Sequence, residues 1–367
     1  MSQTTVGELF SFLENRFPFS LQEDYDNSGF LIGERESIVN GVLVSLDCTT
    51  DIVHEAIQHK CNVILSHHPL IFKGLKRLNF TNDVERVVRL AIKNDISIIA
   101  IHTNLDNHHL GVNRVIGERL GISNPRILQP KKGELYNLAV FVPKDHLHQL
   151  DEAIFKAGAG SIGNYDACRF AGEGEGSFKP LNGANPQEGK IGQREFVKEQ
   201  KVEYLVPKAR LGAVLNAMKT SHPYEEVAHH IYQLDNFHQE IGSGMIGELE
   251  QTMNLKDFLN LVKTAFNCGV IRHSGNLEQS VKKVAWCGGA GSFLIGKAMQ
   301  SKADIYLTGD LKYHDFFIPE ERMVLADIGH YESEQFTSDF LVEELNKNFA
   351  NFAVRLTELS TNPINYF

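Results

Sequence analysis

The chain has 367 residues, enough for two or three domains that each have a hydrophobic core. Its 46 acidic and 36 basic residues give a formal charge of -10, which argues against a nucleic-acid-binding surface. No run of about 18 apolar residues predicts a transmembrane helix. Five scattered cysteines without a Cys-x-x-Cys pair, and an amphipathic first helix in place of a signal peptide, predict a cytoplasmic protein with reduced thiols.

The first third of the chain alternates predicted strands and helices. A capped helix begins after Thr5 and extends to about Phe17. Three strand–helix pairs follow, at Val42–Leu46 with Thr50–His59, Asn62–Ser66 with Asp83–Lys93, and Ile96–Ile101 with Val112–Leu120. Such alternation with short connections predicts a mainly parallel sheet that helices cover on both faces.

From about Pro125 the pattern changes to that of a small α+β domain. Strands are expected at Tyr136–Val142, Tyr165–Phe170, Val202–Val206 and Ala228–Leu234, and helices at Lys144–Ala157 and Ala209–Thr220. The glycine-rich stretch from Gly172 to Gly192 is expected to be a long exposed hairpin loop. The order β-α-β-β-α-β is that of a ferredoxin-like fold, so we interpret residues 125–246 as an inserted domain.

The α/β pattern resumes after Gly244. Strands are expected at Val281–Trp286, Ala303–Leu307, Met323–Ile328 and Phe352–Leu356, and helices around Leu255–Val262, Ser292–Gln300 and Tyr331–Asn346. The predicted fold class is therefore α/β, with two halves, residues 1–124 and 247–367, that form one core interrupted by the inserted ferredoxin-like α+β domain.

Histidines follow two successive strands of the first half, at the point where each strand ends. The first strand ends in Ser66-His67-His68-Pro69, and the next ends in His102-Thr103-Asn104-Leu105-Asp106. Because the carboxyl ends of parallel strands meet at one edge of a sheet, His67, His68, His102 and Asp106 are expected to converge. A structural role explains one such strand end equally well, whereas two successive ends favour a metal site.

A third contribution comes from the second half, where a strand leads through Gly329 to His330 and Glu334. These two residues share one helix face if the helix begins at His330, although Glu334 could also serve only to complement the helix dipole. The predicted metal ligands are His67, His68, Asp106, His330 and Glu334. Three imidazoles and two carboxylates are more protein ligands than one catalytic zinc ion with an open coordination position binds, so they predict two divalent ions. The imidazoles favour zinc, iron or manganese over magnesium.

His314 and the glycine-rich segment Gly288–Ser292 are weaker indications of function. His314 also follows a strand end, so His314 and His102 are predicted to transfer protons or to support the ligands, and a packing role at His314 is equally compatible. The glycine-rich Gly288–Ser292, between a strand and a helix, could hold an anion, but it lacks a Walker lysine.

The combined motifs resemble those of the Nif-three-like family, whose members are also named GTP cyclohydrolase 1 type 2 homologues. The motifs are Asp26-Asn27-Ser28-Gly29, Ser66-His67-His68-Pro69, His102-Thr103-Asn104-Leu105-Asp106, Gly309-Asp310 with His314, and Gly329-His330-Tyr331-x-x-Glu334. The resemblance implies a dinuclear metal centre at the same five ligands and a toroidal homohexamer whose metal sites face an internal cavity. The segment His222-Pro223-Tyr224-Glu225 makes the insert similar to the PII-like and CutA-like domain of the longer bacterial members.

Three functions compete on these grounds. The first is a metal-dependent hydrolase that acts on a small molecule, a nucleotide or a phosphoester, in line with the GTP cyclohydrolase name of the similar family. The second is a non-catalytic metal-binding or regulatory hexamer that senses a ligand through its PII-like insert. A DNA-binding regulator is the third, and the acidic charge and the lack of a basic reading helix disfavour it.

Overall fold

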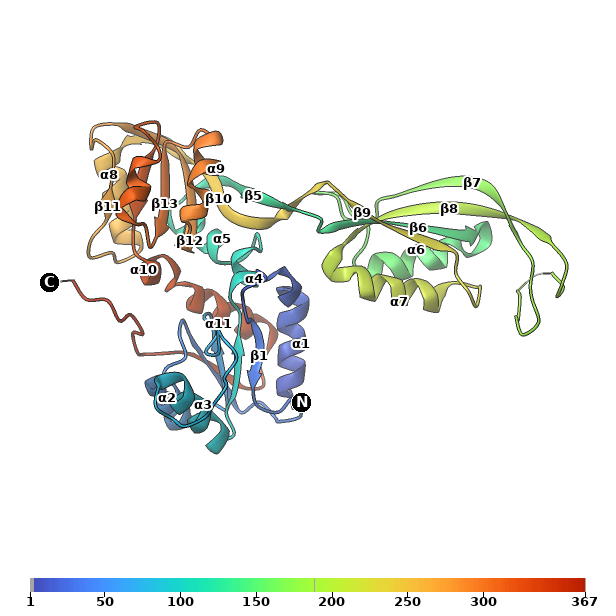
Figure 1. Cartoon of the computed structure of the whole chain (residues 1–367), viewed down its shortest axis with the longest axis horizontal. Helices are drawn as coiled ribbons and strands as arrows, with labels where there is room; N and C mark the ends of the chain where they lie inside the picture. Colours follow the sequence, from blue (N-terminus) through green and yellow to red (C-terminus); the bar gives the residue numbers. More distant parts are fainter. Residues whose placement is uncertain (1–2, 188, 367) are drawn as a thin grey trace. The chain divides into compact units, whose positions relative to one another are not determined.

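The computed structural model describes residues 3–187 and 189–366. The chain forms two compact units: unit 1 contains the residues up to Gln129 and from Glu240 onward, and unit 2 contains Pro130–Gln239. The two chain segments of unit 1 are drawn in blue to teal and in orange to red in Figure 1, and unit 2 is drawn mainly in green and yellow.

The first sheet of unit 1 has the strand order β1-β4-β3-β2-β15. Its strands are β1 (Gly29–Ile32), β2 (Gly41–Ser45), β3 (Val63–Ser66), β4 (Ser97–Ala100) and β15 (Ala353–Leu356). Strands β15, β2, β3 and β4 are parallel, and β1 is an antiparallel edge strand that the sequence analysis did not predict. Its helices are α1 (Val6–Arg16), α2 (Thr50–Gln58), α3 (Asp83–Lys93), α4 (Thr103–Asp106) and α5 (Val112–Arg119), with the short 3-10 helix η1 (Phe19–Leu21). The predicted parallel sheet is therefore confirmed, and the last strand of the chain joins it.

The second sheet of unit 1 has the order β11-β14-β13-β12-β10-β5. Its strands are β5 (Ser123–Lys132), β10 (Phe237–Asn254), β11 (Arg272–His273), β12 (Ser280–Ala290), β13 (Ile305–Gly309) and β14 (Val324–Asp327). The helices in this part of the chain are α8 (Leu255–Ala265), η4 (Ser292–Leu294), α9 (Ile295–Gln300), η5 (Tyr313–Phe317), α10 (His330–Glu334) and α11 (Thr337–Asn348), and α11 packs on β15 and β2 of the first sheet. The three central strands, β12, β13 and β14, are parallel.

The main hydrophobic core of unit 1 joins the two sheets. Val44 and Leu65 of the first sheet belong to the same buried cluster as Trp286 and Leu307 of the second. A separate cluster packs α2 and α3 against the opposite face of the first sheet. The central strands are buried on both faces, which explains their nearly continuous runs of aliphatic residues in the sequence.

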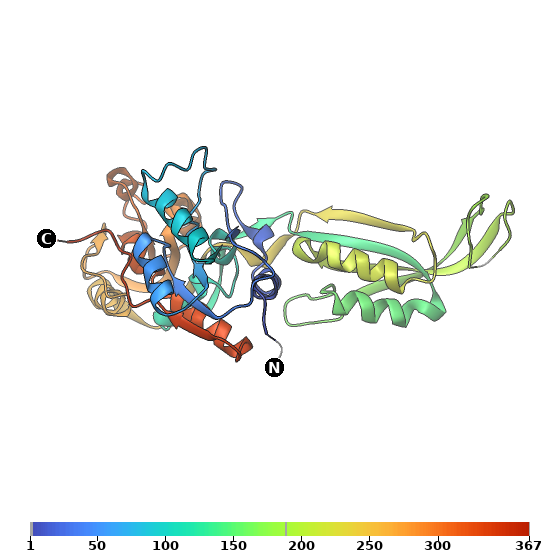
Figure 2. The ribbon, with the colours of Figure 1, turned by 90° about the horizontal axis from the view of Figure 1, so that it is seen from below.

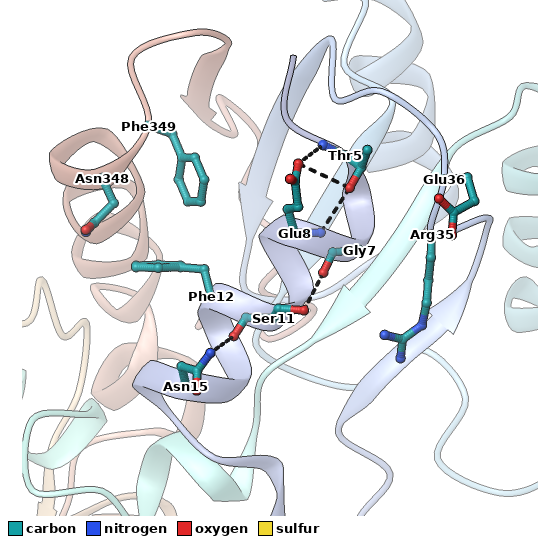
Figure 3. A pocket seen from close by; sticks show the side chains of 10 residues that line it. All are labelled: Thr5, Gly7, Glu8, Ser11, Phe12, Asn15, Arg35, Glu36, Asn348 and Phe349. Carbon is teal, nitrogen blue, oxygen red and sulfur yellow. Dashed lines mark hydrogen bonds between the residues drawn. The ribbon is translucent and has the colours of Figure 1, made fainter. Parts of the chain in front are cut away.

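Helix α1 begins with a capping box. The Thr5 side chain accepts a hydrogen bond from the Glu8 amide (3.1 Å), and the Glu8 carboxylate accepts one from the Thr5 amide (2.8 Å), as drawn in Figure 3. A shallow pocket lies beside this helix and is lined by Thr5, Gly7, Glu8, Ser11, Phe12, Asn15, Arg35, Glu36, Asn348 and Phe349. These residues include none of the predicted metal ligands, so the pocket does not mark the candidate site.

Unit 2 is a four-stranded antiparallel sheet with two helices. Its strands are β6 (Leu135–Pro143), β7 (Arg169–Phe178), β8 (Glu195–Pro207) and β9 (His229–Leu234), and its helices are α6 (Leu147–Lys156) and α7 (Leu211–Ser221), each preceded by a short 3-10 helix, η2 (Lys144–His146) or η3 (Lys208–Arg210). The strand order is β7-β8-β6-β9. Both helices lie on one face of the sheet, as Figures 1 and 2 show, and pack on a core that includes Val140, Ile154 and Val202.

The prediction of a loop beginning at Gly172 is wrong. Strand β7 continues to Phe178 and pairs with β8 as far as Glu195. Glycines alternate with glutamates along this part of β7, so the glycines share one face while each glutamate stands on the other. The glycine content suggested a loop, but the cross-strand hydrogen bonds satisfy the backbone in an extended conformation.

Trp286 connects the two halves of unit 1. Its ring is fully buried, and its Nε1 donates a hydrogen bond of 2.7 Å to the Asn113 carbonyl. Replacing Trp286 by phenylalanine is expected to destabilise the protein by about 2 kcal/mol, because a cavity forms and a buried carbonyl loses its donor. Urea unfolding monitored by circular dichroism measures the change in the free energy of unfolding. Phe293→Leu, at a 63% exposed position, is the control and should leave the midpoint unchanged.

Tyr204 gives unit 2 a dependence on alkaline pH. Burial, together with a 2.7 Å hydrogen bond to Asp151 and the charge of that carboxylate, raises the pKa of Tyr204 far above its ordinary value. The folded state favours the protonated phenol, so this stabilisation is complete below pH about 10 and is lost as the pH rises further. Urea midpoints between about pH 8 and 11 should therefore fall less steeply in Tyr204→Phe than in the wild type. An identical slope in both proteins would contradict this assignment.

Candidate metal centre

The carboxyl ends of neighbouring strands deliver the predicted ligands to one place. Beyond β3, the amides of His67 and His68 donate to Ser45 (3.1 Å) and Leu46 (2.9 Å), so the parallel hydrogen-bonding pattern continues past the strand. Asp106 ends the single-turn helix α4, which directly follows β4. In the second half, Gly329 has a φ of 92° and turns the chain so that α10 begins at His330.

Glu334 lies at the centre of the cluster. Its Oε2 is 3.0 Å from His68 Nε2 and 3.1 Å from His330 Nε2, and its Oε1 is 3.9 Å from His67 Nε2. His67 Nε2 is also 3.6 Å from Asp106 Oδ1. Three overlapping groups offer ligand atoms within 4.8 Å of one another: His68 with His330 and Glu334, His67 with Asp106 and Glu334, and His67 with His68 and His102. The structure thus brings all five predicted ligands together, and His102 lies with them, as the sequence analysis expects.

Each of the four clustered histidines is oriented through its Nδ1 atom. The acceptors of the Nδ1 hydrogen bonds are Ile101 O for His67 (2.8 Å), Asp47 Oδ1 for His68 (2.7 Å), Asp26 Oδ1 for His102 (2.8 Å) and Asp310 Oδ2 for His330 (2.8 Å). With Nδ1 protonated in this way, Nε2 carries the lone pair that can bind a metal. This arrangement is typical of metal sites in proteins, where an outer carboxylate or carbonyl orients each histidine ligand.

The residues present fit a bound cation. His67 Nε2 and Asp106 Oδ1 are buried and have no hydrogen-bond partner among the described residues. Two such acceptors facing each other are costly unless a positive charge lies between them. Imidazoles together with carboxylates are the donor set that zinc, iron and manganese prefer.

The ionisable groups of the cluster affect one another's protonation. Burial, with the nearby His68 and His102, lowers the pKa of His67 to about 3, so this imidazole is neutral, as a metal ligand must be. Burial also opposes protonation of His68 and His330, but hydrogen bonds to Asp47, Asp310 and Glu334 outweigh it and raise their pKa values to about 10 and 9. Protons on these two imidazoles compensate the Glu334 carboxylate, and a divalent cation would compete with them.

The pKa values of Asp106 and Asp26 are shifted in opposite directions. Burial and the charge of Glu334 raise the pKa of Asp106 to about 7. Asp26 is also buried, which opposes its ionisation, but hydrogen bonds from His102, Thr103 and Ser28 hold its pKa well below the usual range. Asp26 is therefore a firmly ionised partner for His102.

Glycines at the ends of β12 and β13 lie against Glu334 and His330. A Cβ atom on Gly289 would lie 2.3 Å from Glu334 Oε1, and one on Gly309 would lie 2.8 Å from the His330 amide nitrogen. The suggested anion site at Gly288–Ser292 is not supported at three of its amides, which donate to side chains. Those of Gly288, Gly289 and Gly291 donate to the side chains of Asn113, Ser333 and Thr308. The glycines instead allow α10 to approach closely.

Sequence reasoning missed the role of Asp47. It follows β2 as His67 follows β3, so the same rule of polar residues at strand ends would have found it. His314 lies on η5, is exposed, and contacts the rings of Tyr313 and Phe317. None of the clusters of potential metal ligands in the described chain contains it. Its predicted role in proton transfer stays a prediction.

Comparison with known proteins places this fold and site in a family. The family described as Duf34/NIF3 (NGG1p interacting factor 3) matches residues 4–363, and the chain belongs to it. The chain is 37% identical over 366 residues to a "GTP cyclohydrolase 1 type 2 homolog" of Staphylococcus epidermidis, covering 98% of this chain and 99% of the relative. It is also 37% identical to the Bacillus subtilis protein of the same description, with 100% of both chains covered.

Solved structures agree with this assignment. The chain resembles a Bacillus cereus protein related to NIF3 with a TM-score of 0.88 and 36% identity, covering 100% of both chains. It resembles Staphylococcus aureus protein SA1388 with a TM-score of 0.78 and 31% identity, again over 100% of both. Among the described residues, the helices are too short or too polar to cross a membrane.

Proposed function

We propose that unit 1 binds two divalent metal ions per chain and is a metal-dependent hydrolase. The observation that carries this proposal is the position of Glu334, whose two carboxylate oxygens face different sets of ligands. Oε1 faces His67, which lies beside Asp106, whereas Oε2 faces His68 and His330. One carboxylate placed between two ligand groups favours a bridged pair of ions over a single closed site.

The chain's own residues would hold the ions, orient the ligands and move protons. His67 and Asp106 would serve one ion, His68 and His330 the other, and Glu334 both. Zinc, iron or manganese bound there would polarise a water molecule and stabilise negative charge on a substrate oxygen. His102, whose Nδ1 is held by Asp26, would accept or donate a proton at Nε2, and His314 is the second candidate for this role.

The substrate class proposed is a small molecule, in the first instance a nucleotide or phosphoester. The name shared by the relatives, GTP cyclohydrolase 1 type 2 homolog, supports testing GTP first. Ring opening of GTP releases formate, so metal-loaded protein that yields no formate from GTP would exclude this reaction. A screen of phosphoester substrates then shows whether the protein hydrolyses any of them.

Metal content tests the centre itself. Elemental analysis of the purified chain should give two ions per chain, and anomalous scattering should place them on either side of Glu334. One ion per chain, or ions distant from His67 and His68, would refute the dinuclear centre.

A second candidate function is regulatory, and unit 2 supports it. The strand order β7-β8-β6-β9 with α6 and α7 on one face matches the ferredoxin-like pattern, and we propose that unit 2 is a PII-like inserted domain. The domain limits proposed from the sequence are 1–124, 125–246 and 247–367, and unit 2, Pro130–Gln239, lies within the middle range. In this case the chain would bind metal without turnover, and a small ligand would bind within residues 125–246.

We also propose that the chain assembles in the cytoplasm as a toroidal homohexamer, as the family resemblance implies. Light scattering should then give six times the 41.2 kDa of the chain. A stable monomer or dimer at micromolar concentration would contradict the hexamer.

A further inference from the structure

The segment that follows β15 lies along the ligand-bearing part of unit 1. This C-terminal segment, residues 357–366, has no helix or strand and is drawn as an extended chain in Figure 1. It is nevertheless fixed by hydrogen bonds at its start. The Thr357 amide donates to the Val44 carbonyl (3.0 Å), the Thr357 hydroxyl donates to Glu55, and the Glu358 amide donates to Glu55 Oε1 (2.8 Å).

Thr361 reaches a metal-ligand candidate through one intermediate residue. Its hydroxyl donates a hydrogen bond of 2.6 Å to Asp47 Oδ2, and the other oxygen of that carboxylate accepts from His68 Nδ1 at 2.7 Å. His68 Nε2 in turn is 3.0 Å from Glu334 Oε2. Because Thr361 and His68 hold different oxygens of the same carboxylate, rotation of the Asp47 carboxylate is restricted. Its orientation determines where the His68 ring points.

The next residue contacts the opposite half of the site. Asn362 Nδ2 donates to Glu332 Oε1 at 3.2 Å, and Glu332 lies on α10 between His330 and Glu334. Two successive residues of the C-terminal segment therefore contact the supports of ligands from both halves of the chain. Both contacts are hydrogen bonds to carboxylates, so their main effect is to fix the orientation of Asp47 and Glu332 and not to bury apolar surface.

We propose that Thr361 and Asn362 form a positioning clamp for the metal centre. Thr361 acts through Asp47 to set the direction of His68 Nε2, and Asn362 acts through Glu332 to set the position of α10. Both are positioning residues, since neither contacts the cluster of ligand atoms directly. This inference rests on the proposed metal-binding function and extends the site to the C-terminal segment.

A pair of matched substitutions tests the clamp. Thr361→Val removes the hydroxyl that holds Asp47, and Thr357→Val removes a hydroxyl that anchors the same segment to Glu55, which is not hydrogen-bonded to any of the clustered histidines. Thr361→Ser restores the hydroxyl. The measurements are the affinity of the full chain for Co²⁺, by competition with a chromophoric chelator, and the visible absorption spectrum of bound Co²⁺, which reports ligand geometry.

Thr361→Val is expected to weaken Co²⁺ binding about 10-fold and to change the Co²⁺ spectrum, as loss of an outer-sphere contact does. Thr357→Val should bind Co²⁺ as the wild type does, and Thr361→Ser should recover both the affinity and the spectrum. Asn362→Ala, which leaves Thr361 intact, should also weaken binding.

Two results would overturn the clamp. The first is a Thr361→Val variant that binds Co²⁺ with wild-type affinity and a wild-type spectrum. The second is an equal loss of Co²⁺ affinity in Thr361→Val and Thr357→Val, which would show that the segment only needs to be attached and that the contact of Thr361 with Asp47 has no specific role. Thermal melting of both variants shows whether a loss of binding reflects unfolding. A wild-type chain that binds no Co²⁺ would instead refute the proposed metal centre itself.

Discussion

Replacing Glu334 by glutamine is expected to reduce the bound metal from two ions per chain to one at most. Glu334 is the residue shared by the His68–His330 group and the His67–Asp106 group, so both would lose a charged ligand at once. Losing even an outer-sphere partner of a metal ligand typically costs about 10- to 100-fold in affinity, and a direct ligand should cost more. Chelator competition and elemental analysis measure the loss.

Glu344→Gln is the matched control for this substitution. Glu344 is also a buried carboxylate, but it lies on α11, pairs with Arg16 and is outside the clusters of potential metal ligands in the described chain. It should retain both ions. If Glu334→Gln also retained two ions with wild-type affinity, the bridging role of Glu334 would be refuted.

Replacing Gly289 by alanine is expected to impair both folding and metal binding. Gly289 has a φ of 61°, which costs a non-glycine residue about 1 kcal/mol or more. The added Cβ would also lie 2.3 Å from Glu334 Oε1, so the carboxylate or the loop must move. Urea unfolding should show the destabilisation, and Co²⁺ affinity should fall at least about 10-fold.

Gly296→Ala provides the comparison. Gly296 lies in α9, and no atom would approach within 4 Å of an added Cβ there. Alanine favours helices, so this variant should be as stable as the wild type or more stable, with unchanged metal binding. Equal behaviour of the two variants would show that the close approach at Gly289 does not matter.

Much of the site could be predicted because ligands at strand ends follow a simple rule. The strand that ends at Ser66 is a run of aliphatic residues, and in a parallel sheet its end must lie beside the end of the next strand. His67, His68 and Asp106 could be placed together on this basis. His330 and Glu334 followed from the four-residue spacing on a helix, and α10 does begin at His330.

The remaining parts depend on contacts between distant segments. The sequence gives no periodic signal that β15 joins the first sheet beside β2, or that Thr361 then meets Asp47. The length of β7 was underestimated because its glycines suggested a loop, whereas pairing with β8 satisfies its backbone. Gly288 and Gly289 suggest an anion site in the sequence, whereas in the structure they end β12 and allow close packing around Glu334.

The adjacency of β5 and β10 has a consequence for the construction of the whole chain. Unit 2 leaves unit 1 at the end of β5 and returns at the start of β10, and these strands are hydrogen-bonded neighbours in the second sheet. The two attachment points are therefore held close together, as in a β-hairpin. The pairing of β5 with β10 in unit 1 fixes the distance between the two ends of the chain segment that forms unit 2. In engineering terms, unit 2 occupies the position of a hairpin turn, so we expect that a short turn or a foreign domain could replace residues 130–239 without moving a predicted metal ligand.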